Sequence, residues 1–236
     1  VYWDAINGAS YYTLYYSTTV TGTYSGTPGY GFIGSGTTAP LAGDVGNTPL
    51  DRYWNYSSAE MIYLPSELGG TPFTISSLGF YKDSGTSGVS IAGVTIYLKH
   101  TSATSLTTGT TTLTGYTQVY SSSFPNSGTS GWQNVNLSPT FAYNGTSSLQ
   151  MLVVKANEAY ITVGNPLYRY TSRTPTRARS DANDTNGWST SLILSATNQL
   201  PNISFNGGTT TTLASTTQMY QLTGSITSVT TTQTST

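Results

Sequence analysis

Residues 91–100 read IAGVTIYLKH, and this stretch decides the fold class. Apolar side chains occupy every second position, at Val94, Ile96 and Leu98, with Thr, Tyr and Lys between and after them. Successive side chains of a strand point to opposite faces of its sheet, so this alternation predicts a strand with one buried face. Residues 150–155, QMLVVK, carry a continuous apolar run instead, which is typical of a central strand covered on both faces.

The rest of the chain has the same strand character. Thr, Tyr, Val and Ile are abundant, and these branched or aromatic side chains fit a pleated sheet better than a helix. Turns of Gly, Asn, Ser and Pro separate short segments, without the alternation of strands and helices that builds a parallel sheet. We therefore predict an all-β, jelly-roll-like two-sheet β-sandwich. The predicted strands are residues 1–5, 11–17, 74–81, 93–100, 117–123, 131–137, 148–156, 159–163, 191–195 and 202–206.

One stretch, residues 57–68, has helical features. Ser58 is a suitable N-cap, Glu60 lies early in the stretch, and Gly69 and Gly70 follow it. Pro65 would break a longer helix, so the expectation is a helix of about one turn.

The charge content excludes several classes of function. The 236 residues include 8 Lys+Arg, 9 Asp+Glu, 1 His and no Cys, for a net charge of -1. Nucleic acids and anionic membranes attract clustered Lys and Arg, and no basic block is present, so we expect neither partner. The lack of Cys excludes thiol catalysis, iron–sulfur ligation and the common zinc sites. No run approaches the roughly 18 apolar residues of a membrane span, so we expect no membrane insertion.

An uncharged surface rich in Thr, Ser, Tyr and Gly suits extracellular β proteins, so we expect a secreted or cell-surface location. The first residues, VYWD, have neither the basic nor the apolar region of a signal peptide. The expectation is therefore that the signal peptide is absent from this chain.

The first 28 residues resemble part of a fibronectin type III domain. Asn7-Gly8 is a hairpin-forming dipeptide between two strand-like segments. Trp3, followed by the pattern Tyr12-x-Leu14-Tyr15-x-Ser17, is similar to strands B and C of that domain. The resemblance covers only a hairpin, so residues 1–30 are expected to be a partial domain.

Residues 31–206 resemble the jelly-roll-like β-sandwich modules of secreted and surface proteins of the Bacteroidota, many of which the type IX system exports. The matching pieces are PLDRYWNYS at 49–57, MIY at 61–63, ELG at 67–69, VTIYLKHT at 94–101, FAYNGTSSL at 141–149 and LPNISF at 200–205. The resemblance carries no catalytic motif. It implies a surface-exposed accessory, adhesive or structural module.

The Thr-rich tail, residues 207–236, has an alternating apolar thread near its end that includes Ile226 and Val229. A fibronectin-like sandwich has a strand A beside strand B, and residues 225–236 have the pattern of such a strand. We therefore expect the tail to complete the N-terminal hairpin of the same chain or of the next subunit, through the side chains Val1, Trp3, Tyr12, Leu14, Ile226 and Val229. The alternative is a solvated linker.

Pairing between subunits would be a heterologous contact, which need not close and so generates filaments. The sequence thus predicts an extracellular structural subunit whose partners are copies of itself. One repeat of a tandem adhesin array is the alternative arrangement.

Arg169, Arg173, Arg177 and Arg179 place four cations within eleven positions. We interpret Arg169, Arg173 and Arg177 as subunit-interface residues, because arginine forms forked hydrogen bonds to carboxylates. Three other uses remain open: an acidic partner or a glycan, pairing with nearby aspartates, or an ordinary solvated loop.

Oxygen-bearing side chains gather at Asp181, Asn183 and Asp184, followed by Gly187. Carboxylate and amide oxygens are the ligands that Ca²⁺ prefers, so these three residues are a candidate calcium site. Asn, Asp and Gly clusters are also ordinary turn formers, and the spaced pattern of an EF-hand is missing. Calcium is the one cofactor that the sequence suggests.

A second hypothesis is a carbohydrate-binding surface module, with calcium as an aid to binding. Trp3, Trp54, Trp132 and Trp188, together with 19 Tyr, could stack on the apolar faces of sugar rings. Core and sheet packing is the commoner use of such side chains.

We expect no enzyme activity. The single histidine, His100, has no Gly-x-Ser-x-Gly elbow to serve. Glu60 and Glu67 form the only carboxylate pair that suggests glycoside hydrolysis, and no third acid is organised around them. We interpret these two glutamates, and Glu158, as structural.

Overall fold

The computed structural model describes residues 31–41 and 47–206, so residues 1–30, 42–46 and 207–236 lie outside the described part. The described residues form strands and no helix, and none of them could therefore cross a membrane as a long apolar helix. The strands are β1 Gly31–Ile33, β2 Tyr56–Tyr63, β3 Phe73–Ser84, β4 Ile91–Thr101, β5 Thr117–Phe124, β6 Gly131–Tyr143, β7 Ser148–Lys155, β8 Leu167–Tyr168, β9 Tyr170–Ser172, β10 Ala178–Asn183, β11 Ser195–Thr197, β12 Gln199–Pro201 and β13 Ile203–Phe205.

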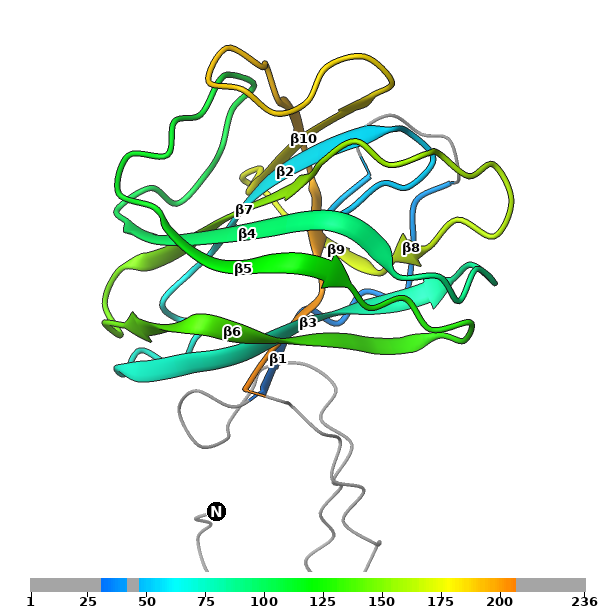
Figure 1. The fold of residues 1–236 in the computed structure, drawn as a ribbon. Helices are drawn as coiled ribbons and strands as arrows, with labels where there is room; N and C mark the ends of the chain where they lie inside the picture. The colour runs from blue at the N-terminus through cyan, green and yellow to red at the C-terminus, as the bar shows by residue number, and fades with distance from the viewer. Residues whose placement is uncertain (1–30, 42–46, 207–236) are drawn as a thin grey trace, which may run out of the picture. The chain divides into compact units, whose positions relative to one another are not determined.

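Two antiparallel sheets lie face to face (Figure 1). The lower sheet in Figure 1 has the strand order β1-β13-β3-β6, and β8 pairs with the end of β3. The upper sheet has the order β11-β10-β2-β7-β4-β5. Strands β12 and β9 form a separate two-stranded sheet.

The chain passes repeatedly from one sheet to the other. Strand β2 is in the upper sheet and β3 in the lower, β4 and β5 are in the upper, β6 in the lower and β7 in the upper. This winding between two packed sheets is that of a jelly-roll-like sandwich. The predicted all-β, two-sheet sandwich is thus confirmed.

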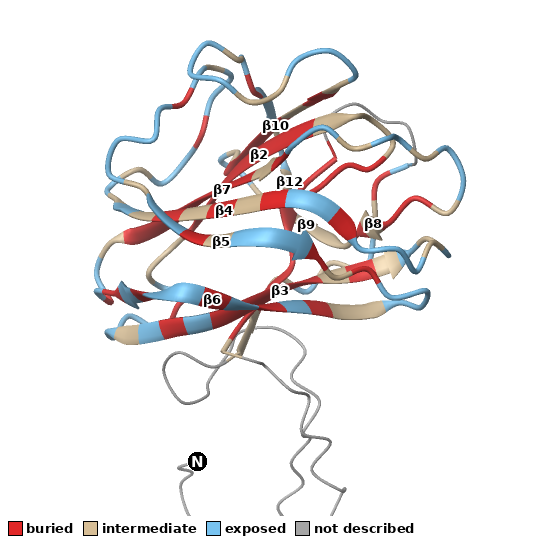
Figure 2. Cartoon of the chain, viewed as in Figure 1, coloured by how far each residue is buried: buried red, intermediate tan, exposed pale blue. Residues whose placement is uncertain are grey.

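The core lies between the two sheets, where buried residues gather in Figure 2. Val94, Ile96 and Leu98 of β4 are all fully buried, as their alternation predicts. On β7, residues 149–153 are buried without interruption, and β7 pairs with β2 on one side and β4 on the other. The apolar run at 150–155 therefore marks a central strand covered on both faces, as predicted.

The helical expectation for residues 57–68 is wrong for most of its length. Residues 56–63 form β2, which sends Ala59, Met61 and Tyr63 into the core at every second position. Pairing of β2 with β10 and β7 outweighs the helical features of this stretch. A single turn follows, in which the Leu68 N–H donates to the Leu64 carbonyl at 3.2 Å.

Two predicted strands are also misplaced. Residues 159–163 form a loop, and 191–195 form a turn that reaches β11 only at Ser195. Both segments carry branched apolar residues that remain outside the core: Val163 and Ile193 are exposed. Strand propensity without a burial partner does not produce a strand here.

The described chain begins and ends on neighbouring strands of the lower sheet. Strand β1 pairs antiparallel with β13, and Gly31 lies opposite Phe205. The first and last strands of the described sandwich thus lie side by side. The predicted hairpin, the tail and the interface residues Val1, Trp3, Tyr12, Leu14, Ile226 and Val229 lie outside the described residues.

Candidate functional site

All eight Lys and Arg residues of the chain belong to the described part, and each is engaged within the chain. The five arginines form ion pairs with glutamate or aspartate. The side chains of Lys82 and Lys155 are fully buried, and Lys99 lies 4.3 Å from the centre of the Tyr116 ring. Basic groups are therefore used to hold the fold, and few remain for a charged ligand.

Glu67 holds two of the arginines that the sequence suggested as interface residues. Arg177 donates to both carboxylate oxygens, at 2.5 and 2.8 Å, and Arg173 lies 3.2 Å from one of them. Burial acts to raise the pKa of Glu67, but the bonds and charges of the two arginines outweigh it and hold the pKa below its ordinary value. Arg177 is buried, so its guanidinium serves this contact.

Glu60 is the most completely bonded charge of the molecule among the described residues. Its side chain is fully buried, and one oxygen accepts hydrogen bonds from Thr111 (2.8 Å), Tyr116 (2.6 Å) and Gln150 (2.7 Å). The other oxygen accepts from Arg179 Nε at 2.5 Å. Burial first, and then the charge of Glu60, raise the pKa of Tyr116 well above its ordinary value, so that phenol remains a donor.

Arg179 extends this network to the loop between β4 and β5. Its two terminal nitrogens donate to the carbonyls of Thr107 and Thr110, at 3.1 and 2.9 Å. Residues 102–116 are thereby fixed to β2 and β10 of the upper sheet. The Glu60 network is therefore a structural clamp with every carboxylate oxygen occupied.

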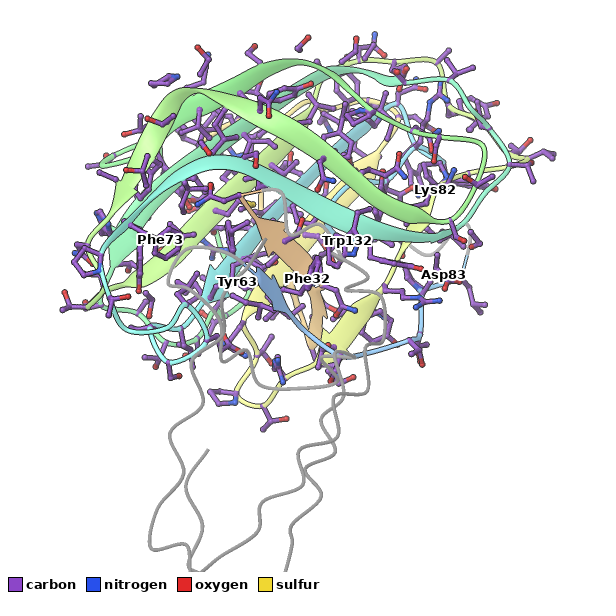
Figure 3. The ribbon with its side chains drawn as sticks, turned by 90° about the horizontal axis from the view of Figure 1, so that it is seen from below. Phe32, Tyr63, Phe73, Lys82, Asp83 and Trp132 are labelled. Atoms are coloured by element: carbon purple, nitrogen blue, oxygen red, sulfur yellow. The ribbon has the colours of Figure 1, made fainter. Side chains whose placement is uncertain are left out.

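Aromatic side chains gather on the outer face of the lower sheet, and Figure 3 shows Phe32 and Trp132 there, on β1 and β6. Their rings stack, with centroids 4.7 Å apart, and Tyr81 meets the Trp132 ring edge-on at 5.3 Å. Arg169 lies 4.4 Å above the Tyr81 ring and is held by Asp83 at 2.7 Å. We call these five residues the aromatic cluster.

The surface beside the aromatic cluster is polar and uncharged. Ser204 on β13 donates to Asn134 Oδ1 at 3.0 Å, across Gly79 of β3. A Cβ at Gly79 would lie 2.0 Å from Asn134 Oδ1, so glycine is required for this close approach. Asn136 is exposed further along β6. Half-buried rings and exposed amides thus share the outer face of the lower sheet, while Ser204 is buried there.

A second polar group, the end cluster, closes one end of the sandwich. It contains Asp51 and Arg52, which precede β2, and Lys155, the last residue of β7. Arg52 pairs with Glu158 at 3.2 Å, and Lys155 Nζ donates to the carbonyls of Trp54 and Asn55, both at 2.7 Å. The same end carries Asn126, Asn165 and Tyr168, all buried.

Burial dominates the titration of the end cluster. It raises the pKa of Asp51 to about 6, although the Tyr53 N–H donates to one carboxylate oxygen at 2.9 Å. Burial also lowers the pKa of Lys155 to about 8, against the opposing charges of Glu158 and Asp51. Both groups are therefore ionised at neutral pH only at a cost in free energy.

An apolar tip lies at this end of the sandwich, formed by Val89, Tyr160 and Val163. Their exposed fractions are 61%, 54% and 83%. The two loops that carry them are joined, because the Ser87 N–H donates to the Gly164 carbonyl at 3.1 Å. Arg52 donates to the Val89 carbonyl at 3.3 Å, so the end cluster is hydrogen-bonded directly to the apolar tip.

The structure places the candidate calcium residues in strand β10 and the turn after it. Asn183 donates to Asp181 at 2.7 Å, and its own oxygen accepts from the N–H groups of Thr185 and Asn186. Asp184 accepts from the Asn55 N–H at 3.1 Å. The described residues contain no group of three His, Asp or Glu side chains suited to a metal. The calcium site stays a prediction, and these contacts are those of a turn.

The remaining candidates have local partners. His100 accepts from the Asn144 N–H at 3.1 Å, its ring packs on Phe141 and Tyr143, and burial lowers its pKa. Glu60 and Glu67 belong to separate arginine networks. Of the tryptophans in the described part, Trp132 joins the aromatic cluster, and the ring nitrogens of Trp54 and Trp188 are buried.

Sequence reasoning missed two groups. The aromatic cluster joins three strands, β1, β3 and β6, to the residue between β8 and β9. These parts are far apart in the chain, and the alternation of β6, with Trp132 two positions before exposed Asn134, was the only local signal. The end cluster contains Asp51 and Arg52, which were quoted only as part of a resemblance. Charged residues are rare in this chain. Asp51 and Arg52 in the end cluster, and Asp83 and Arg169 in the aromatic cluster, were therefore the signal that could have indicated the two groups.

No family model matches this sequence, and neither the curated proteins nor the solved structures include one that is similar to it at a significant level. The resemblances to fibronectin type III and Bacteroidota modules stay predictions.

Proposed function

We propose that this chain is a structural or adhesive module of the cell exterior that packs against copies of itself. One observation carries the proposal: every basic side chain of the chain is engaged internally, while large apolar side chains remain exposed at the tip. A surface of Ser, Thr, Asn and Tyr with little free charge is what such packing needs.

Copies of this chain can associate because little electrostatic repulsion keeps them apart. Proteins of high net charge repel one another and stay apart, whereas a net charge near zero promotes association. Here the net charge is -1. Exposed apolar side chains such as Val163 then favour contact with another protein surface, because contact removes them from water. The apolar tip is the described surface that best suits this contact.

Strand complementation is the proposed joint between copies. Strand β1, the first of the described sandwich, pairs with β13, the last, and contributes only three residues to the edge of the lower sheet. A short edge strand has backbone groups that a further strand can pair. In this proposal residues 225–236 of one copy pair with residues 1–5 of the next.

Electron microscopy and light scattering of the full chain test the joint. Replacing Ile226 and Val229 by Pro removes two backbone donors, so ordered assemblies should be lost. The matched control replaces Thr227 and Thr230 by Ser, which keeps every backbone donor, and should assemble as the parent does. Ordered assemblies of the proline variant, equal in length and number to the parent's, would contradict strand complementation.

A glycan is the second candidate ligand, and the aromatic cluster favours it. Phe32, Tyr81 and Trp132 are half-buried on the outer face of the lower sheet, and exposed Asn134 lies on the same face of β6 as Trp132, so ring faces and a hydrogen-bonding amide are adjacent. Aromatic rings that combine with polar neighbours are typical of binding surfaces.

A glycan array decides between the two candidates. Trp132→Ala should abolish any signal that depends on the aromatic cluster, whereas Tyr160→Ala, which removes an exposed ring from the apolar tip, should leave it intact. Signals that survive Trp132→Ala, or an array without any signal, would eliminate the aromatic cluster as a sugar site.

A further inference from the structure

Buried polar atoms without a hydrogen-bond partner gather in the end cluster. Among the described residues, Asp51 Oδ2, Asn126 Oδ1, both side-chain heteroatoms of Asn165 and the Tyr168 hydroxyl are buried and unpartnered. The four side chains are 0%, 3%, 4% and 1% exposed. Native proteins pair nearly all such groups, so each of these atoms requires a partner of some kind.

Asn126 and Arg52 both make direct hydrogen bonds to the loop that contains Ser87 and Val89. Asn126 Nδ2 donates to the carbonyls of Ser87 and Val89, at 2.7 and 3.0 Å. Arg52 Nη1 donates to the Ser87 hydroxyl and to the same Val89 carbonyl, at 3.2 and 3.3 Å. Asn126 and Arg52 are therefore neighbours, joined through one short loop.

The other two side chains lie against the same residues. The Asn165 side chain lies against the Asp51 carboxyl and lowers its pKa as a hydrogen-bonding group does, although the two side chains lie outside the geometry of a direct hydrogen bond. The charge of Lys155 lowers the same pKa. Burial raises the pKa of Tyr168, and the charge of Arg52 acts to lower it. The Tyr168 ring packs on Phe124, which lies two residues before Asn126. The Ser87 N–H also donates to the Gly164 carbonyl at 3.1 Å, so the segment that carries Asn165 binds the same loop as Asn126 and Arg52. The unpartnered atoms are thus carried by segments that meet at this loop.

The chemistry of these atoms selects the ligand. Asn126 Oδ1 and Asp51 Oδ2 only accept hydrogen bonds, Asn165 Nδ2 only donates, and the Tyr168 hydroxyl does both. A metal ion would satisfy the acceptors alone, and here it would meet the positive charges of Arg52 and Lys155. A water molecule donates and accepts, and buried waters typically make about three hydrogen bonds to such groups.

We infer that the end cluster is an internal water site, in which ordered water molecules bridge Asp51, Asn126, Asn165 and Tyr168. These waters would join the segment before β2 to the loops that follow β5 and β7 and to strand β8. They would act as part of the fold, in the way that an extra polar side chain does. The inference is independent of the proposed assembly.

A crystal structure of the full chain at about 1.2 Å resolution tests the site. We expect solvent peaks about 2.7–3.2 Å from at least two of the unpartnered atoms. Crystals grown with added calcium and with a chelator should show the same peaks. A peak about 2.3–2.6 Å from the Asp51 and Asn165 oxygens that needs calcium would replace the water site by a metal site. Direct bonds among the four side chains would overturn it.

A pair of tyrosine variants tests the site in solution. Tyr168→Phe removes a hydroxyl that has no protein partner, so the number of long-lived internal waters measured by water-proton magnetic relaxation dispersion should fall by at least one. Tyr63→Phe is the control, because the equally buried Tyr63 hydroxyl donates directly to the Pro201 carbonyl at 3.0 Å. That variant should keep the parent's number of internal waters.

Either an unchanged count of internal waters in Tyr168→Phe, or an equal loss in both variants, would overturn the assignment. Both changes remove a single oxygen and keep the ring, so the two variants are expected to fold.

Discussion

Two buried carboxylates of the sandwich, Glu60 and Asp51, differ in how completely the protein hydrogen-bonds them. Both side chains are fully buried. Glu60 accepts hydrogen bonds from four side chains, including a charged arginine, whereas Asp51 has one oxygen bonded to a backbone N–H and the other without a partner among the described residues. Burial of a charge is tolerated in both places, but only the Glu60 site supplies protein donors to both carboxylate oxygens.

The difference explains what each site does. The Glu60 network ties a long loop to the upper sheet, and its stability depends on the completeness of its bonding. The end cluster also ties several loops together, but Asp51 Oδ2 has no direct hydrogen bond among the described residues, and burial raises the pKa of Asp51 to about 6. Four measurements would sharpen or break this comparison.

The largest effect is expected from Glu60→Gln. The substitution leaves the buried guanidinium of Arg179 without its counter-charge, which costs about 3–5 kcal/mol of the free energy of unfolding. Urea denaturation measures the loss. The double variant Glu60→Met with Arg179→Met should recover most of it, since no buried charge is then unpaired. A single variant within 1 kcal/mol of the parent would contradict the clamp.

The second effect concerns pH and Asp51. Because its pKa is raised in the folded state, from an ordinary 3.8 to about 6, the folded protein binds this proton more tightly than the unfolded chain does. The contribution of Asp51 to stability is therefore full below about pH 4 and is lost as the pH rises through about 6, a change of about 3 kcal/mol.

Urea denaturation of the parent and of Asp51→Asn from pH 4 to 7 isolates that contribution. The difference in free energy of unfolding between the two proteins should change steadily across this range in favour of the variant. A difference that is constant with pH would mean that Asp51 titrates at its ordinary pKa.

A smaller effect is expected from Tyr116→Phe. The change removes one of the hydrogen bonds to the Glu60 carboxylate and leaves the ring in place, so the loss should be about 2 kcal/mol. Thermal unfolding measures it. Tyr120→Phe is the matched control, because that hydroxyl bonds a nearby carbonyl in an exposed position. A loss in the control as large as in Tyr116→Phe would show that the carboxylate is not the cause.

The smallest effect is expected from Arg169→Ala. Its ion pair with Asp83 is about 30% exposed on both sides, so solvent screens it, and the loss should be below about 1 kcal/mol even with the ring contact to Tyr81. Denaturation in low and high salt measures it, and the loss should shrink in high salt. A larger loss would mark the aromatic cluster as a packing centre of the lower sheet.

Local sequence patterns correctly predicted the strands whose burial depends on neighbouring residues in the sequence. The alternation at Val94, Ile96 and Leu98 predicted β4, and the apolar run at 150–155 predicted the central strand β7. These predictions succeeded because side-chain periodicity directly reflects which face of a strand is buried. The two-sheet architecture followed from many such segments without helices between them.

Contacts between distant residues were beyond local patterns. Arg179 is one of four arginines within eleven positions of the sequence. It lies on β10 and pairs with Glu60, which is 119 positions away. Residues 57–68 were misread for the same reason, since the pairing of β2 with β10 and β7 decides their conformation. The aromatic cluster likewise exists only once β1, β3 and β6 are assembled.

The neighbouring positions of β1 and β13 have a mechanical consequence. Gly31 lies opposite Phe205, at the point where both flanking segments leave the sandwich. Tension transmitted through those two segments would peel the antiparallel pair apart from that point, one hydrogen bond after another, instead of shearing all of its bonds together. Under load the module would yield first at β1, while the clamped upper sheet stays folded.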